Sequence, residues 1–461
     1  MSQTIDSLLA GLAAELPPGT VLSGAEAGPR HRHDWTRVNP CEPRAVFRPR
    51  STAEVATILR HCHAASQPVV VQGGLTGLAG GATPRPGEVA LSLERLGGVE
   101  EIDPDSGTMR VRAGTPLAAV HEAADRHGLQ FALDLGARGS CLIGGNIATN
   151  AGGNRVIRYG MTRDLVLGLE AVLADGTVVS SLNAMLKNNA GYDVKQLFVG
   201  TEGTLGVVTR AVLRLHPAPR ERITAFVATD SFTALVALLR EARAAFGGQL
   251  GSFETMWENY FEFAFQALKS GARPFAAPHA HYALIEIEAL EPAVDAERLE
   301  TFLARMLDTG TAADALIARS LDESARLWRI RESAGEILQK LGVPMAYDVS
   351  LPIAHMTGYL EKLRAEVPGV LGERPLFVFG HLGDGNLHLV TGLLSLAEVE
   401  PLDRVVYGAL AGFGSVSAEH GIGVLKRHWL GASRQPAEVE LMRRLKATLD
   451  PRGILNPGRV L

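Results

Sequence analysis

The apolar positions in the early part of the chain predict short helices and strands in alternation. Ser51 or Thr52 can cap a helix, and the apolar residues that follow recur at helical spacing. The run of valines at 69–71 is then a short buried strand that leads directly into glycines. A helix, a strand and a glycine-rich turn in this order are typical of α/β architecture.

Further short strands are expected up to about residue 217, on the same reasoning from apolar runs and turn signals. Residues 89–115 hold two of them, and residues 165–180 are expected to form a hairpin. The Asp-Gly pair at 175–176 supplies the positive φ that such a turn needs. Residues 203–217 form either a strand pair or a turn followed by a strand, and Pro-Ala-Pro at 217–219 indicates a boundary.

After residue 220 the glycine-rich loops end and longer elements alternate. Strands are expected at 223–230 and 281–290, and helices at 231–246 and 294–307. A last helix is expected at 438–449. Strand–helix pairs without glycine-rich loops suit an α+β domain that covers a substrate.

Composition and charge narrow the classes of function. Hydrophobic residues make up 46% of the chain and the net charge is −5, so no overall field favours nucleic acid or an anionic membrane. No run is long enough to span a bilayer, and the N-terminus has neither the basic nor the apolar region of a signal sequence. Three cysteines without metal-type spacing suit a reducing compartment. A cytoplasmic protein is therefore expected, with no transmembrane segment and no nucleic-acid partner.

Glycines gather in two clusters that can hold a phosphate-bearing ligand. The first cluster, residues 72–81, follows the predicted strand, and its glycines let backbone N–H groups converge on an anion. It is neither a Walker loop nor a Rossmann turn, and an ordinary flexible turn explains it equally well. The second cluster, residues 136–154, suits backbone laid against a large planar ligand, although a loop without a ligand also fits. Two clusters in one domain favour a dinucleotide.

These clusters resemble the FAD-binding domain of the vanillyl-alcohol-oxidase type. IGGNIATNAGGNRVIRYGMTRDLV at 143–166 and LFVGTEGTLGVVT at 197–209 are similar to its flavin-contacting segments. Nearly the whole chain, from about residue 40 to Leu461, resembles the FAD-linked D-lactate and D-2-hydroxyglutarate dehydrogenases. The resemblance implies an α+β fold with a two-part FAD-binding domain at 1–219, completed by 421–461. Residues 220–420 would form an α+β substrate-binding cap domain with an antiparallel sheet, carrying metal ligands.

The resemblance also implies where FAD contacts the chain. The diphosphate is expected on the backbone of the first cluster, the adenosine side near Gly206 and Val208, and the isoalloxazine end near Asn456. The first cluster has no His or Cys for covalent attachment, although Cys141 lies in the second, so non-covalent FAD is expected. The expected cofactor-binding residues are Gly73, Gly74, Leu75, Thr76, Gly77, Gly80, Gly81, Gly144, Gly145, Asn146, Thr149, Asn150, Gly153, Gly206, Val208 and Asn456.

Two histidines and a later glutamate form a candidate metal site. His381 and His388 flank a Gly-Asp-Gly-Asn turn, which can fold the chain back so that both imidazoles point to one spot. Glu419 adds a carboxylate, and three such ligands leave coordination positions open, as in catalytic sites. Zn²⁺ is the first choice, with Mn²⁺, Fe²⁺ and Co²⁺ also compatible. The histidine pair alone carries little weight, because most histidines are simply partly buried polar residues.

These residues suit the oxidation of a 2-hydroxy acid beside a flavin. Chelation of the metal by the acid lowers the pKa of its hydroxyl group, and a hydride then passes to flavin N5. The resemblance implies His420 as the base that takes the hydroxyl proton and Arg331 as the partner of the substrate carboxylate. Without the resemblance, Arg331 would be taken for a surface helix residue.

Three positions depart from the pattern of D-2-hydroxyglutarate dehydrogenases. Polar residues for the far carboxylate of that substrate are replaced by Gly335, Ala346 and Val390. An anionic tail would have no charged partner there. A D-2-hydroxy acid with an uncharged tail, D-lactate or a larger apolar relative, is therefore expected, with D-2-hydroxyglutarate as the alternative. The candidate substrate-contacting residues are Arg331, Gly335, Ala346, Tyr347 and Val390.

Two other functions are consistent with the flavin motifs. A non-catalytic FAD-binding subunit of a larger oxidoreductase complex predicts damage at the metal and base positions, whereas His381, His388, Glu419 and His420 are all present. A flavoenzyme acting on a sugar or an aldonolactone predicts no metal. No second dinucleotide motif is evident, so an electron-transfer flavoprotein, a quinone or a cytochrome is expected as electron acceptor, and a homodimer is common in such enzymes.

Overall fold

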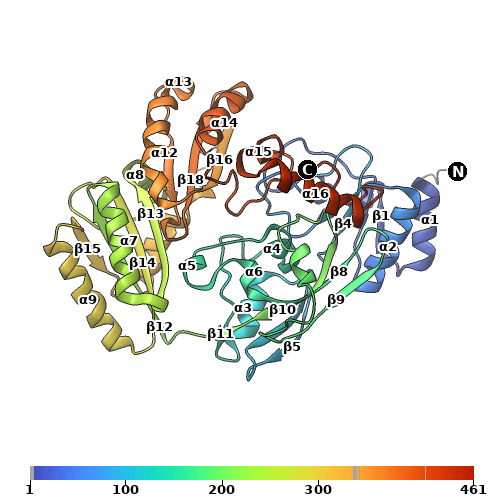
Figure 1. Ribbon diagram of the computed structural model, residues 1–461, viewed down its shortest axis with the longest axis horizontal. Coiled ribbons are helices and arrows are strands. Elements are labelled where there is room, and N and C mark those ends of the chain that lie inside the picture. The colour runs from blue at the N-terminus through green and yellow to red at the C-terminus, as the bar shows by residue number, and fades with distance from the viewer. Residues whose placement is uncertain (1–4, 336–339, 342, 411) are drawn as a thin grey trace. The chain divides into compact units, whose positions relative to one another are not determined.

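The chain forms two compact units in the computed structural model, which describes residues 5–335, 340–341, 343–410 and 412–461 (Figure 1). The first unit comprises Met1–Gly153, Gly160–Ala218 and Glu419–Leu461, and the second comprises Asn154–Tyr159 and Pro219–Ala418. Each unit is therefore discontinuous in sequence.

The first part of the first unit is a four-stranded sheet in the order β1-β2-β4-β3. β2, β4 and β3 run parallel, and β1 is antiparallel to β2. The N–H of Glu54 donates to Ser51 Oγ, so Ser51 is the cap of α2. The elements are α1 (Ile5–Glu15), β1 (Val21–Ser23), β2 (Ala45–Phe47), α2 (Thr52–Ala65), β3 (Val69–Gln72) and β4 (Val89–Ser92).

The second part of the first unit is an antiparallel sheet in the order β5-β6-β10-β8-β9. The predicted hairpin is present as β8 and β9, and Gly176 has a φ of 86° in its turn. Residues 203–217 form a turn followed by a strand. The strands are β5 (Val99–Asp103), β6 (Thr108–Arg112), β7 (Leu129–Gln130), β8 (Val166–Val172), β9 (Val178–Ser181), β10 (Val207–Arg214) and β11 (His216–Pro217). The helices are α3 (Leu117–Asp125), α4 (Ile143–Thr149), α6 (Thr162–Leu165), α15 (Leu430–Ser433) and α16 (Pro436–Leu449).

The second unit is built on a seven-stranded sheet in the order β15-β12-β14-β13-β17-β18-β16. Every neighbouring pair in it is antiparallel. Its strands are β12 (Glu221–Thr229), β13 (Leu250–Trp257), β14 (His281–Ala289), β15 (Asp314–Ile317), β16 (Val343–Ser350), β17 (Phe377–Gly380) and β18 (Asn386–Leu393). Its helices are α5 (Val156–Tyr159), α7 (Phe232–Phe246), α8 (Glu258–Leu268), α9 (Pro292–Asp308), α10 (Leu321–Glu332), α12 (Ile353–Glu366), α13 (Pro368–Leu371) and α14 (Val399–Gly408).

Strand register puts polar residues from three strands on one face of this sheet. Met256 of β13 pairs with Phe379 of β17, which pairs with His388 of β18, which in turn pairs with Asp348 of β16. Glu254 lies two residues before Met256 and therefore shares the face. α8 and α10 contact each other and cover the face that holds Met256 and Phe379. α7 and α9 pack against the opposite face of the sheet at β14 (Figure 1).

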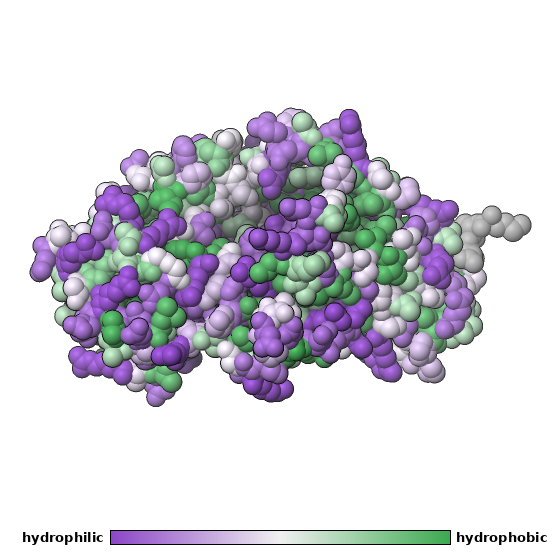
Figure 2. Space-filling model, turned by 60° about the horizontal axis from the view of Figure 1, so that its bottom comes forward, coloured by the Kyte–Doolittle hydropathy of each residue, from purple (hydrophilic) through white to green (hydrophobic). Residues whose placement is uncertain are grey.

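The predicted α+β class is confirmed, with the antiparallel sheet in the second unit. None of the helices in the described part of the chain is both long and apolar enough to cross a bilayer. On the face drawn in Figure 2, hydrophobic areas are interrupted by hydrophilic residues.

Candidate functional site

The two glycine clusters meet in the first unit. A Cβ on Gly74 would overlap the carbonyl oxygen of Ser140 and lie 2.9 Å from Cys141 Cα, so only glycine fits there. A Cβ on Gly73 would lie 3.5 Å from the Cα of Gly145. The loop after β3 therefore packs backbone to backbone against the segment that leads into α4.

The glycines of the second cluster fall into two kinds. A Cβ on Gly144 would approach Ala113 Cβ to 2.8 Å, and one on Gly153 would overlap Asp134 O, so the protein itself requires glycine at both. A Cβ on Gly145 would have no neighbour within 4 Å. The Oδ1 of Asn146, a residue only 5% exposed, has no hydrogen-bond partner in the described part of the chain. An open glycine beside an unpaired buried acceptor fits a ligand such as FAD.

Other predicted cofactor residues already have partners within the protein. Thr149 Oγ1 donates to Gly145 O, and Asn150 Oδ1 accepts the N–H of Arg163. A Cβ on Gly206 would lie 2.8 Å from the Phe198 ring, and Val208 is a buried residue of β10. Among the remaining predicted positions, Leu75 has a φ of 61°, Thr76 is half-buried, and Gly77 and Gly81 approach Asp34 and Glu202.

The C-terminal segment is tied to the first cluster through Asn456. Leu455 forms a parallel bridge with Val69 at the start of β3. Asn456 Oδ1 accepts the N–H of Val71 at 2.7 Å, and its Nδ2 donates to Glu202 O. The side chain of Asn456 is thus used to join three segments of the first unit.

Glu202 is a half-buried residue that the sequence analysis did not predict. Its carboxylate accepts the N–H groups of Ile422 at 2.6 Å and Gly423 at 2.9 Å, and its own N–H donates to Ala148 O at 2.7 Å. Burial raises the pKa of the Glu202 carboxyl, against the effect of the two N–H donors, which lower it. Glu202 thereby fixes residues 422–423 to α4, immediately after the candidate base His420.

The glycine-rich turn between the two histidines folds the chain back as predicted. β17 and β18 form an antiparallel hairpin, and Gly385 in its turn has a φ of 83°. The rings of His381 and His388 lie 5.2 Å apart between centroids, edge to face. Both residues are buried.

Four residues could hold a metal ion in this region. Ligand atoms of Asp348, His388, Glu419 and His420 all lie within 4.8 Å of one another. The N–H of Ala418 donates to Asp348 O, so a backbone hydrogen bond to β16 fixes the residue just before Glu419. Two carboxylates and two imidazoles are ligands that suit Zn²⁺ and its first-row neighbours. The predicted ligands His388 and Glu419 belong to this group, which His381 does not join.

Asp348 was not predicted as a site residue. It is fully buried and directly opposite His388 in the strand register. Its Oδ1 accepts a hydrogen bond from Asn386 Nδ2 at 2.9 Å and lies 3.9 Å from His388 Nδ1. At 3.9 Å this carboxylate oxygen lies close to the imidazole but beyond hydrogen-bond range of Nδ1.

Arg331 is buried in α10, with its guanidinium group over the polar face of the sheet. Its Nη2 lies 2.7 Å from Glu254 Oε2 and 3.3 Å from His381 Nε2. Its Cζ lies 5.0 Å from the Phe379 ring centroid, and Tyr260 Oη donates to its carbonyl oxygen. The Nε of Arg331 has no hydrogen-bond partner among the described residues.

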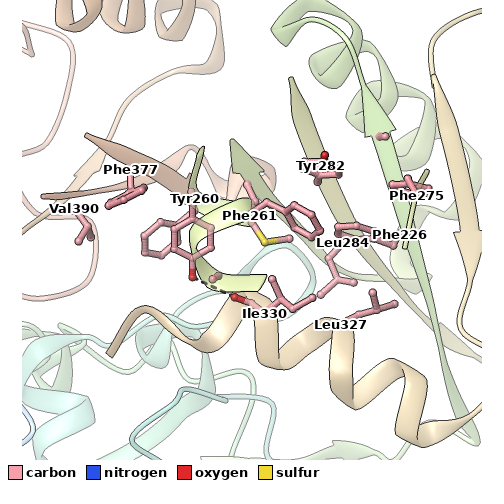
Figure 3. Close-up of a cluster of buried hydrophobic side chains, with 14 residues drawn as sticks. Phe226, Tyr260, Phe261, Phe275, Tyr282, Leu284, Leu327, Ile330, Phe377 and Val390 are labelled. Atoms are coloured by element: carbon pink, nitrogen blue, oxygen red, sulfur yellow. Dashed lines mark hydrogen bonds between the residues drawn. The ribbon is translucent and has the colours of Figure 1, made fainter. Parts of the chain in front are cut away.

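Figure 3 shows the apolar cluster on which α10 rests, with Tyr260 directed at the backbone of Ile330. Phe379 stacks on Tyr260 with ring centroids 4.2 Å apart. This packing holds the helix that carries Arg331, so an arginine that would be unremarkable on a surface helix is turned inward here.

The other predicted substrate residues lie in different surroundings. Val390 is buried and pairs with Ala346 across β18 and β16, against the same apolar cluster. Tyr347 is fully buried on the opposite face of β16 and donates to Asp403 at 2.7 Å. Gly335 is exposed and would have open space around a Cβ.

Two known protein families match most of the chain. Residues 43–181 match the FAD binding domain family, and residues 218–460 match the family described as FAD linked oxidases, C-terminal domain. Among solved structures, p-cresol methylhydroxylase with bound substrate has a TM-score of 0.77 at 15% identity, covering 99% of this chain and 96% of that one. A 4-ethylphenol oxidase from Gulosibacter chungangensis has the same TM-score at 18% identity and the same coverage. The fold is therefore that of the vanillyl-alcohol-oxidase type.

Curated relatives match almost the whole chain. The mitochondrial D-2-hydroxyglutarate dehydrogenase of Bos taurus is 42% identical, over 96% of this chain and 81% of the relative. The D-2-hydroxyglutarate dehydrogenase of Xanthomonas citri pv. viticola is 40% identical, over 93% of this chain and 91% of the relative. A D-2-hydroxyglutarate–pyruvate transhydrogenase of Saccharomyces cerevisiae is 35% identical over 93% of this chain and 88% of the relative.

The fold and the site together define an FAD-linked oxidoreductase that acts on CH–OH groups. The chain belongs to the FAD-linked oxidase family, and within it to the FAD-dependent D-2-hydroxy-acid dehydrogenases.

Proposed function

We propose that the protein oxidises a D-2-hydroxy acid to the 2-oxo acid with FAD and a divalent metal. The observation that carries the proposal is the buried Arg331, which lies within 3.3 Å of His381 on the face of the sheet that also holds His388. A fixed guanidinium group next to candidate metal ligands suits a substrate that carries a carboxylate beside its hydroxyl group.

Each group has a distinct task in the proposed reaction. FAD, when bound, supplies the hydride acceptor, and the metal, when bound, lowers the pKa of the substrate hydroxyl group. Arg331 binds the substrate carboxylate through its unpaired Nε and orients C2. His420 takes the hydroxyl proton.

We propose His381, His388 and Glu419 as the residues that hold the metal. One nitrogen of His420 cannot serve both as a metal ligand and as a base. We therefore propose that His420 lies close to the other three residues of the cluster because it acts as the base beside the metal. Asp348 is already engaged by Asn386 and Ser417, which suits an orienting role behind His388.

D-2-hydroxyglutarate is the first candidate substrate. The relatives support it better than an acid with an uncharged tail, because the bovine and Xanthomonas proteins carry that substrate in their names. One observation favours the uncharged tail as a second candidate: the facing pair Ala346 and Val390 is apolar and packs with Phe377.

Anaerobic reduction of the protein-bound flavin tests the proposal. D-2-hydroxyglutarate, D-lactate, a longer alkyl D-2-hydroxy acid and their L-enantiomers would be compared before and after chelator treatment. We expect D-acids, but not L-acids, to bleach the flavin. We expect chelator treatment to abolish this bleaching and added Zn²⁺ or Mn²⁺ to restore it. Bleaching by L-acids alone, or bleaching unaffected by complete metal removal, would contradict the mechanism, and the ratio of kcat/KM values decides between the two substrates.

Three further properties are proposed from the sequence. The electron acceptor is an electron-transfer flavoprotein, a quinone or a cytochrome, the protein acts in the cytoplasm, and it forms a homodimer. Reoxidation assays with each acceptor class and sedimentation of the purified protein test the first and the last.

A further inference from the structure

The buried carboxylate of Glu254 contacts two side chains of the proposed site. They are His381, proposed as a metal ligand, and Arg331, proposed to bind the substrate carboxylate. Glu254 is 1% exposed and lies on β13, on the face of the sheet defined by Met256 and Phe379. His381 follows β17, the next strand in the sheet, and Arg331 reaches the same place from α10. Three elements far apart in sequence therefore converge on this side chain.

The two oxygens of Glu254 serve different partners. Oε1 lies 2.7 Å from Nδ1 of His381, and Oε2 lies 2.7 Å from Nη2 of Arg331. The contact to Arg331 is an ion pair whose angles do not make it a hydrogen bond, since Oε2 has no such partner among the described residues. The carboxylate is thus positioned to hold both groups at once.

The contact to Nδ1 sets the tautomer of His381. A carboxylate accepts only, so Nδ1 must carry the proton, and the lone pair of His381 lies on Nε2. Arg331 Nη2 lies 3.3 Å from that Nε2, which agrees with this tautomer. Nε2 carries the lone pair that a metal would take in place of the contact to Arg331, as in carboxylate–histidine–metal arrangements.

The contact to Nη2 determines which edge of Arg331 remains for a ligand. Glu254 and His381 occupy Nη2, whereas Nε is buried without a partner in the described residues. Nε is therefore the donor left for a substrate carboxylate, because the second donor on that edge of the guanidinium group is Nη2 itself.

We infer that Glu254 is a positioning residue that couples the metal ligand His381 to the substrate-binding Arg331. The inference rests on the proposed function both for the metal at His381 and for the substrate at Arg331. Without this carboxylate, Nδ1 of His381 would lose its acceptor and the guanidinium group of Arg331 would lose its ion-pair partner. Metal affinity and substrate affinity would therefore fall together.

Glu254→Gln tests the inference against a matched control, Glu286→Gln. Glu286 is a buried glutamate on the neighbouring strand β14, opposite Ser252, and its partners are Arg155, Arg222 and Trp328. Zn²⁺ affinity of the FAD-loaded proteins would be measured by competition with a chromogenic chelator. KM and kcat for D-2-hydroxyglutarate and D-lactate would then be measured at saturating Zn²⁺.

We expect Glu254→Gln to weaken Zn²⁺ binding by about 10–100-fold. At saturating Zn²⁺ we expect KM to rise about tenfold with kcat within a few-fold, because Arg331 contributes binding that is similar in the ground and transition states. Glu286→Gln should leave both values unchanged. Zn²⁺ affinity and KM of Glu254→Gln both within twofold of wild type would overturn the inference.

Two outcomes separate this inference from the proposed function. If Glu254→Gln does not retain FAD, Glu254→Asp decides instead, because it keeps the charge but is one methylene too short to reach both partners, and wild-type values for it would also overturn the inference. A wild-type flavin that no D-2-hydroxy acid reduces would contradict the proposed function, and the Zn²⁺ affinities would still decide the role of Glu254.

Discussion

The carboxylate of Glu202 accepts the backbone N–H of Gly423 at 2.9 Å, across 221 residues of sequence. It accepts the N–H of Ile422 as well, so one side chain holds the loop that directly follows His420. These two hydrogen bonds fix the backbone that follows the candidate base and do not involve its imidazole ring.

Glu202→Ala should destabilise the first unit and loosen this loop. Two partly buried N–H groups would lose a charged acceptor, at a cost of about 3 kcal/mol in the free energy of unfolding. We expect a fall in Tm of several degrees and faster loss of FAD on dilution. Glu297→Ala, which removes an exposed glutamate of α9, is the control. An unchanged Tm would show that the two hydrogen bonds contribute little.

Glycine-to-alanine changes in the two clusters should separate packing from cofactor binding. Gly74→Ala forces a clash with Ser140 and should prevent folding of the first unit. Gly145→Ala meets no protein atom within 4 Å, so the apoprotein should keep its Tm. If the flavin lies there, FAD affinity should fall by about 1–3 kcal/mol. Fluorescence titration with FAD measures this affinity. An affinity equal to that of the wild type would show that FAD does not lie against Gly145.

Asp348→Asn should weaken metal binding while FAD stays bound. The amide keeps the shape of the side chain but removes the charge 3.9 Å from His388 Nδ1. We expect Zn²⁺ affinity to fall about 10–100-fold. Asp403→Asn is the matched control, because Asp403 accepts the Tyr347 hydroxyl group on the opposite face of β16. Equal effects of both variants would point to general destabilisation of β16.

The stability of the protein should fall as the pH decreases through the titration range of His281. Burial lowers the pKa of His281 to about 4, with Arg364 adding to the effect. A folded pKa below the unfolded value of 6.5 means that this contribution is complete above pH 6.5 and is lost as the pH falls towards 4.

His281→Phe should reduce that dependence, because the ring already lies among aromatic neighbours, with the Trp257 centroid 5.1 Å away. Between pH 7.5 and pH 5 the wild type should lose about 2 kcal/mol more than the variant. Thermal unfolding at both pH values measures the difference. Parallel curves for the two proteins would assign the acid sensitivity to other groups.

Sequence pattern predicted the local features well, because short-range geometry determines them. The Asp-Gly hairpin is present, Ser51 caps α2 through the N–H of Glu54, and the Gly-rich turn brings His381 back beside His388. Each depends on residues within about ten positions of one another, where turn and cap chemistry is decisive.

The partners of the candidate site were beyond that range. Asp348 faces His388 only because β16 and β18 pair in one particular register, and a shift of one residue would reverse the faces. Glu254 and His381 are 127 residues apart and meet through strand order in the sheet. Glu202 lies in a turn and Glu254 in a strand, and neither glutamate has a local sequence signal that indicates its distant partners, so the two could not be identified from the sequence.

The bridge between Val69 and Leu455 has a consequence for biosynthesis. Asn456 supplies an acceptor to Val71 across 385 residues, so the first cluster lacks that partner until residue 456 leaves the ribosome. The sheet of the second unit is built wholly from residues 221–393 and can form earlier, during translation. A nascent chain stalled before residue 455 should therefore hold a folded sheet in its middle and an immature flavin-binding region.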